Sequence, residues 1–119
     1  MANRFKTIEE LVSEYAEYAS QHGKATELGD YKKGNKVHDK LIKIYRQIKE
    51  QGDLAHPMFK KMLYSSDPGV KSWAASHLLA ISPKEAETVL TDIGKTPNSL
   101  VAFTANMILE EWKKGRLVL

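Results

Sequence analysis

Two side chains in the middle of the chain could do chemistry together. Trp73 and His77 lie four residues apart in the segment DPGVKSWAASHLLAISPKE, which places both on one face of a helix. A catalytic imidazole needs an orienting carboxylate and a nucleophile or metal ion within reach. The local sequence offers only the hydroxyls of Ser72 and Ser76. We therefore predict that Trp73 and His77 are core residues, a large ring and a hydrogen-bonded imidazole wedged between helices.

The competing interpretation is an enzyme centred on His77 and Trp73, with Asp39 or His38 approaching from a neighbouring pair of helices. No motif for a phosphate-binding loop or a nucleophile elbow occurs in the sequence. The histidines lie on different predicted elements, without the spacing that mounts two metal ligands on one helix face. They are His22, His38, His56 and His77. We expect no catalytic residue, no metal site, no cofactor and no enzymatic activity.

Helical patterns run along the whole chain, and no alternating strand pattern appears. The chain has 119 residues, which is most simply one domain, 1–119. The predicted helices are approximately 7–22, 30–51, 56–65, 68–81, 83–95 and 98–114. Gly34 lies inside the second of them, where we expect it to let a neighbouring helix approach closely.

Capping residues mark the ends of these helices. Thr7 and Glu10 have the spacing of a capping box, which predicts a helix start. Gly23 is the expected C-cap of that first helix. Ser82 and Glu85 have the same spacing as Thr7 and Glu10, and they predict a second capping box at the fifth helix.

The second half of the chain repeats itself at a shift of 30 residues. Such a repeat is typical of stacked supersecondary units, because each unit buries its apolar face against the next. The shift superposes Phe59 on Val89, Leu63 on Ile93, Val70 on Leu100, Trp73 on Phe103, Ala75 on Ala105, Leu78 on Ile108 and Leu79 on Leu109. The sequence therefore predicts two successive helical hairpins of one design.

The segment DPGVKSWAASHLL resembles the second helix of a HEAT-type repeat. The residues that match the repeat pattern are Asp67, Pro68, Val70, Ala74, Ala75 and Leu78. Trp73 and His77 depart from it. Phe103 and Met107 take the same places in the second hairpin, so we expect all four in packing slots between helices. The resemblance implies an all-α fold of about six helices, arranged as a short HEAT/ARM-like right-handed solenoid of antiparallel helical hairpins.

Charge is divided between the first two predicted helices. The formal net charge of +3 is too small to indicate nucleic-acid binding by itself. The acidic face of the first helix consists of Glu10, Glu14 and Glu17. The basic stripe of the second consists of Lys33, Lys36, Lys40 and Lys43. An acidic face would suit a basic partner and a lysine stripe could track phosphates, but two solvated faces that exchange surface ion pairs would look the same.

Nucleic-acid binding through the basic stripe is the runner-up hypothesis for function. Proteins that bind single strands usually interleave aromatic rings with their basic residues, so that bases can stack on the rings. We expect Tyr31 and Tyr45 on or near the buried side of the second helix. This placement disfavours a nucleic acid as the partner.

Nearly the whole chain resembles a family of small bacterial proteins with HEAT/ARM-like helical repeats and formerly unknown function. The segments that carry the resemblance are GDYKKGNKVHDKL, DPGVKSWAASHLL and FTANMILEEWKKGRL. Such families include immunity proteins of contact-dependent growth inhibition systems. The resemblance implies a non-catalytic module that binds a cognate toxin domain, such as a nuclease, in a 1:1 complex. Candidate contacts are Glu10, Glu14, Glu17, Lys71, Asn106, Glu110 and Lys113.

The chain has no cysteine, no apolar run of signal-peptide length and no stretch long enough to span a bilayer. We therefore expect a soluble cytoplasmic protein that does not act at a membrane. The apolar residues Leu117, Val118 and Leu119 remain open to three interpretations. They could form a docking strand, a cap for the last helix or a simple tail.

Overall fold

The computed structural model describes residues 6–119, which form six α-helices and one short 3-10 helix, with no strand in that range. The helices are α1 (Ile8–Leu28), α2 (Tyr31–Glu50), the 3-10 helix η1 (Gly52–Ala55), α3 (His56–Met62), α4 (Pro68–Leu78), α5 (Pro83–Ile93) and α6 (Leu100–Lys113). The all-α prediction is confirmed. Predicted helix boundaries hold to within three residues, except at the end of α1. None of these helices has both the length and the apolar composition needed to cross a membrane.

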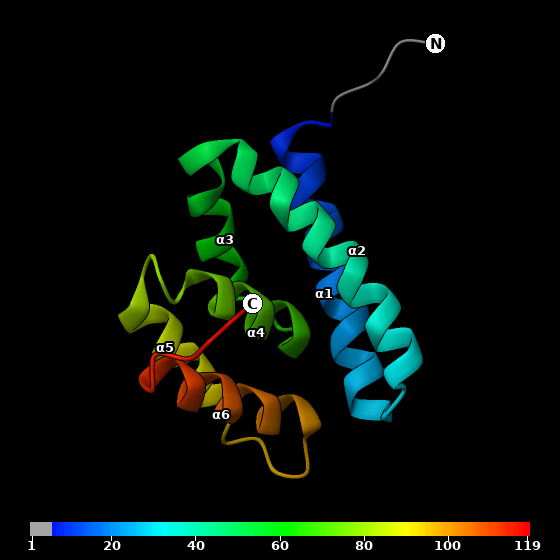
Figure 1. The fold of residues 1–119 in the computed structure, drawn as a ribbon, viewed down its shortest axis with the longest axis vertical. Helices are drawn as coiled ribbons and strands as arrows, with labels where there is room; N and C mark the ends of the chain where they lie inside the picture. The colour runs from blue at the N-terminus through cyan, green and yellow to red at the C-terminus, as the bar shows by residue number, and fades with distance from the viewer. Residues whose placement is uncertain (1–5) are drawn as a thin grey trace.

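Helix α4 is the centre of the fold. It packs against α1, α3, α5 and α6, and eight of its eleven residues are buried. Helices α1 and α2 form a long antiparallel pair along one side, and α5 and α6 lie on the other side of α4 (Figure 1). Helix α2 runs alongside α1 and η1 and reaches α3 and α4 only through side chains such as Tyr45, so it forms the outer edge of the described fold.

The first predicted capping box is confirmed, and the second is wrong. The Glu10 N–H donates to Thr7 Oγ1 at 3.1 Å, and the Thr7 N–H donates to Glu10 Oε1 at 3.0 Å. The Ser82 side chain makes no capping hydrogen bond at the start of α5. Glu85 lies 3.7 Å from the Lys60 ammonium instead, because α3 and its lysine are brought beside α5 in the tertiary structure.

Helix α1 does not end at Gly23, as the sequence predicted, but continues to Leu28 and is capped by Gly29 at φ +70°. Gly23 lies where α1 crosses α4. A Cβ on Gly23 would lie 2.8 Å from the Gly69 Cα, and a Cβ on Gly69 would collide with the Ala19 carbonyl oxygen. Gly23 is therefore used for close helix packing and not as a helix stop.

The extra length of α1 carries Glu27 to the start of α6. The Val101 N–H donates to Glu27 Oε1 at 2.7 Å, and the Ser99 hydroxyl donates to the same oxygen at 3.2 Å. A carboxylate at a helix N-terminus satisfies unpaired N–H groups and complements the helix dipole. Glu27 thus ties the first helix to the last.

Gly34 does not permit a close helix approach, contrary to the prediction. A Cβ on Gly34 would lie 3.9 Å from the Ala25 Cβ, which is an ordinary van der Waals distance. The sequence marked a glycine in a helix as unusual, but only the tertiary structure shows which glycines lie at a crossing. Gly23 and Gly69 are those residues.

Residue pairs superposed by the 30-residue shift have the same burial on the inner side of each hairpin but not on the outer side. Three superposed pairs are buried in both hairpins: Leu63 and Ile93, Ala75 and Ala105, and Leu79 and Leu109. The outward pairs differ, since His77 is buried while Met107 is 50% exposed. The expectation that Phe103 and Met107 fill packing slots is therefore wrong. Side chains of α1 and α2 cover this face of α4, and no described element covers it on α6.

Substitution of Gly69 by alanine is expected to lower the free energy of unfolding by about 3 kcal/mol, because the new methyl group meets backbone atoms that cannot move aside. Gly34→Ala is the matched control, since its methyl group has room and alanine favours the helix by about 1 kcal/mol. Urea denaturation of the two variants measures both changes. Equal stability of the two variants would contradict the close crossing.

Candidate functional site

Trp73 and His77 lie in an aromatic cluster where α1, α2, α3 and α4 meet. The members of this cluster are Tyr15, His22, His38, Tyr45, Phe59, Trp73 and His77. The Tyr15 hydroxyl lies 2.6 Å from His77 Nδ1, and the Tyr45 ring stacks on the imidazole with centroids 3.6 Å apart. The Trp73 indole N–H donates to His22 Nδ1 at 3.2 Å. The prediction of a buried, hydrogen-bonded His77 in the core is confirmed.

Burial controls the protonation of this cluster. It lowers the pKa of His77 from 6.5 to about 3, with smaller electrostatic contributions from Lys49 and His38. It also raises the pKa of the Tyr15 phenol, so the phenol keeps its proton and can donate it to His77 Nδ1. The imidazole is then neutral with its proton on Nε2. That atom is buried without a hydrogen-bond partner in the described range.

The geometry around His77 differs from that of a catalytic base. Its hydrogen-bond partner is a phenol and not a carboxylate. Asp39 is exposed and lies 3.7 Å from His38, whose ring packs on the Trp73 ring with centroids 5.6 Å apart. The buried Ser76 hydroxyl donates a hydrogen bond to the Ser72 carbonyl oxygen, at 2.7 Å. Among residues 6–119, no group of three or more histidine or acidic side chains is placed to hold a metal ion.

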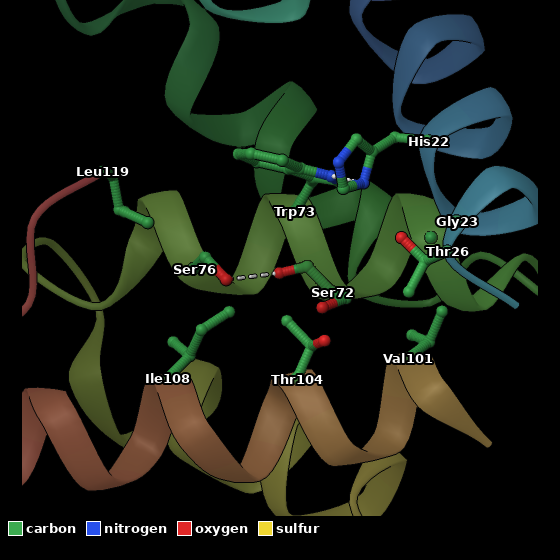
Figure 2. Close-up of a pocket in the computed structure, with 11 residues that line it drawn as sticks. His22, Gly23, Thr26, Ser72, Trp73, Ser76, Val101, Thr104, Ile108 and Leu119 are labelled. Carbon is green, nitrogen blue, oxygen red and sulfur yellow. Dashed lines mark hydrogen bonds between the residues drawn. The ribbon is translucent and has the colours of Figure 1, made fainter. Parts of the chain in front are cut away.

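A small cavity of about 120 Å³ lies beside Trp73, between α1, α4 and α6 (Figure 2). Figure 2 shows Ser72 and Ser76 of α4 facing Thr104 and Ile108 of α6 across it. The apolar Leu119 closes one side, and Leu117 packs on the core. The cavity is lined by hydroxyl and apolar groups, with the imidazole of His22 as its one titratable side chain within the described residues. It therefore offers no acid/base pair.

The predicted acidic face of α1 is occupied by local contacts. Glu10 belongs to the capping box, and Glu14 is bound by the Lys6 ammonium at 2.6 Å. Glu17 accepts a long hydrogen bond from Gln21, at 3.4 Å. No ion pair links α1 to α2 in the described range, so the expected exchange of surface ion pairs between them is absent. All three carboxylates thus have contacts within or next to α1.

The predicted basic stripe follows one side of α2, and all four of its lysines are exposed to solvent. The Lys40 ammonium lies 6.0 Å from the centre of the Tyr18 ring, a cation–π distance. Tyr45 lies in the aromatic cluster, near the buried side as predicted. The expectation for Tyr31 is wrong, since 71% of its surface is exposed at the first residue of α2. Helix α2 begins beyond the end of the core, which leaves that ring in solvent.

The remaining predicted contacts lie on two helices. Lys71 is half-buried on α4, while Asn106, Glu110 and Lys113 are exposed on α6. Their spacing of four and three residues places the α6 residues along one side of that helix. Glu110 accepts a hydrogen bond from Lys114 at 2.9 Å, and this contact lowers the pKa of the Glu110 carboxyl.

An exposed apolar row on α6, missed in the sequence, runs beside these polar residues. It consists of Leu100, Phe103 and Met107, which are 49%, 62% and 50% exposed. The opposite side of α6 is buried against the core through Val101, Ala105 and Leu109. A signal was present in the sequence, because the segment LVAFTANMIL is apolar on nearly all sides of a helix. Such a helix is normally covered on every side.

No protein-family model, curated protein or solved structure matches the chain. What the protein binds is therefore inferred from its own surfaces. The aromatic cluster is buried or half-buried, so the two surfaces that stand out are the basic stripe and the apolar row.

Acidification is expected to destabilise the fold through His77. The imidazole stays neutral in the folded protein down to about pH 3, but in the unfolded chain it takes up a proton near pH 6.5. Its contribution to stability is therefore complete above pH 6.5 and is lost as the pH falls, by about 3 kcal/mol at pH 4. Urea denaturation at pH 7 and pH 4 measures the loss.

His77→Met, which introduces the residue of the second hairpin, removes the titrating group and should reduce this pH dependence. His56→Gln is the control, because His56 is only half-buried and lies outside the cluster. If His77→Met lost stability with falling pH as steeply as the unsubstituted protein, the role given to the buried imidazole would be wrong.

Proposed function

We propose that the protein is a non-catalytic protein-binding module, most specifically a cytoplasmic immunity protein that neutralises a cognate bacterial toxin domain. One observation carries the proposal of protein binding, namely the exposed apolar row of Leu100, Phe103 and Met107 on α6. Contiguous exposed apolar residues bordered by polar ones are typical of protein–protein contacts. The toxin as partner rests on the family resemblance of the sequence.

The internal repeat indicates that the apolar row is suited to being covered by other side chains. Its counterparts on α4 are Val70, Trp73 and His77. Val70 is buried, and side chains of α1 and α2 cover Trp73 and His77. The same face on α6 has no such cover within the described fold. A partner that packs on α6 would bury apolar surface there as α1 and α2 do on α4, at about 25 cal/mol per Å².

The surroundings of the apolar row suit a specific contact. A hollow of about 490 Å³ opens beside Leu100 and Phe103, between α6 and the loop from Gly94 to Ser99. Asn106 lies at its edge, with its amide donating to the Gly94 carbonyl at 3.2 Å. Glu110 and Lys113 continue along the same side of the helix. An apolar centre with a polar border is the usual anatomy of a protein interface.

The scaffold presents this row on a rigid element. Helix α6 is anchored by Glu27 at its start and by buried contacts with α1, α4 and α5. We further propose that the hairpins α3–α4 and α5–α6 are units of a short right-handed HEAT/ARM-like solenoid, as their shared buried positions suggest. A pre-ordered surface loses little entropy when a partner docks, which favours tight 1:1 binding.

Co-expression with the toxin-like domain encoded next to this gene tests the proposal. We expect rescue of growth and a stable 1:1 complex on size-exclusion chromatography. Phe103→Asp combined with Met107→Asp should raise the Kd by more than about 100-fold, since central apolar anchors carry most of the binding energy. Both substitutions lie on the exposed side of α6, so the fold should survive them.

The matched control is Leu54→Asp with Tyr64→Asp, which changes two exposed apolar residues away from α6. This variant should bind and protect like the unsubstituted protein. Absence of both rescue and complex, with a toxin proven active, would reject the immunity function. Rescue that survives the α6 substitutions would leave toxin binding in place and exclude the apolar row as its site.

A further inference from the structure

The net positive charge of helix α2 is larger than that of the whole chain. It carries seven lysines and arginines against two acids, Asp39 and Glu50, while the formal net charge of the chain is only +3. The rest of the protein is therefore net negative. The distribution is one-sided, because α2 forms the outer edge of the fold (Figure 1).

The lysines of the stripe are available to a partner. Lys33, Lys36 and Lys43 form no ion pair with any residue in the described range, and Lys40 has only its distant contact with the Tyr18 ring. All four side chains are exposed. Helix α2 packs on α1, η1 and the aromatic cluster through its other side, where Val37, Leu41 and Ile44 are buried.

The composition of the stripe distinguishes between partners. Protein interfaces are depleted in lysine at their centres and need apolar or aromatic anchors. None of the residues between Lys33 and Lys43 is an exposed large hydrophobic. A phosphate backbone needs no such anchor, because neutralisation of its charge and release of counterions drive binding. Charge complementarity therefore favours a nucleic acid over an acidic protein.

The shape of the stripe distinguishes between a double and a single strand. The eleven residues from Lys33 to Lys43 make ten helical steps and so span about 15 Å along the exposed side of α2. Duplex DNA presents about one phosphate charge per 1.7 Å of its axis, which is a dense and rigid target for such a row. Single strands are usually held in grooves with interleaved aromatic rings. The exposed ring of Tyr31 precedes the row and does not interleave it.

We propose that the basic stripe on α2 binds the phosphate backbone of duplex DNA without reading its sequence. This surface is separate from the apolar row, because α2 and α6 make no contact. The protein could therefore hold DNA and a protein partner at the same time. The proposal does not depend on the protein-binding function proposed above.

Fluorescence anisotropy with a labelled 20-base-pair duplex tests the proposal on the full chain. Four phosphate contacts predict a slope of about −3.6 for log K against log salt, and hence a loss of affinity of about 150-fold between 50 and 200 mM NaCl. The combined variant Lys36→Glu, Lys40→Glu and Lys43→Glu should weaken binding at 50 mM salt by more than about 100-fold. Circular dichroism checks that this variant is folded.

The matched control is Lys61→Glu, Lys84→Glu and Lys95→Glu, which makes the same change in net charge at exposed lysines outside α2. It should retain affinity to within about three-fold. No binding at 50 mM salt, or an equal loss in the control, would overturn the proposal. So would equal or tighter binding of a single strand of the same length, or equally effective competition by poly-glutamate, which would reassign the stripe to single strands or to acidic proteins.

Discussion

The close crossing of α1 and α4 at Gly23 and Gly69 is the constraint on which the rest of the structure depends. Both residues must lack a side chain, because a methyl group on either would meet backbone atoms of the other helix. Helix α1 continues beyond this crossing to Leu28. The last turns of α1 then bring Glu27 to the N-terminus of α6, so that one contact between glycines leads to the anchoring of a helix far along the chain.

The same crossing sets the register of the aromatic cluster. Along α4, Trp73 and His77 follow Gly69 by one and two turns, and along α1, His22 and Tyr15 precede Gly23. On this side of the crossing, Trp73 meets His22 and His77 meets Tyr15. The cluster therefore fixes the packing of four helices around a neutral imidazole. Its buried Nε2 is a cost that this packing offsets.

The two edges of the fold are chemically different. Helix α2 is buried on one side and strongly basic on the other, so its free side is stable in water and attracts anions. Helix α6 is apolar on both sides, and its free side exposes Leu100, Phe103 and Met107. One edge is thus suited to charge and the other to the burial of apolar surface. The centre of the molecule, in contrast, is devoted to packing.

The sequence by itself determined the helices, most of their ends and the core position of His77, because apolar periodicity, proline and capping residues act locally. It also showed the basic stripe of α2. Only the tertiary structure decided that α1 continues through Gly23 and that Glu85 pairs with Lys60. It alone also decided that Phe103 and Met107 are exposed. The physical reason is the same in each case. A repeat pattern or a glycine shows which local conformations a segment can adopt. Whether a residue is exposed or lies at a helix crossing depends on whether another helix packs against its segment.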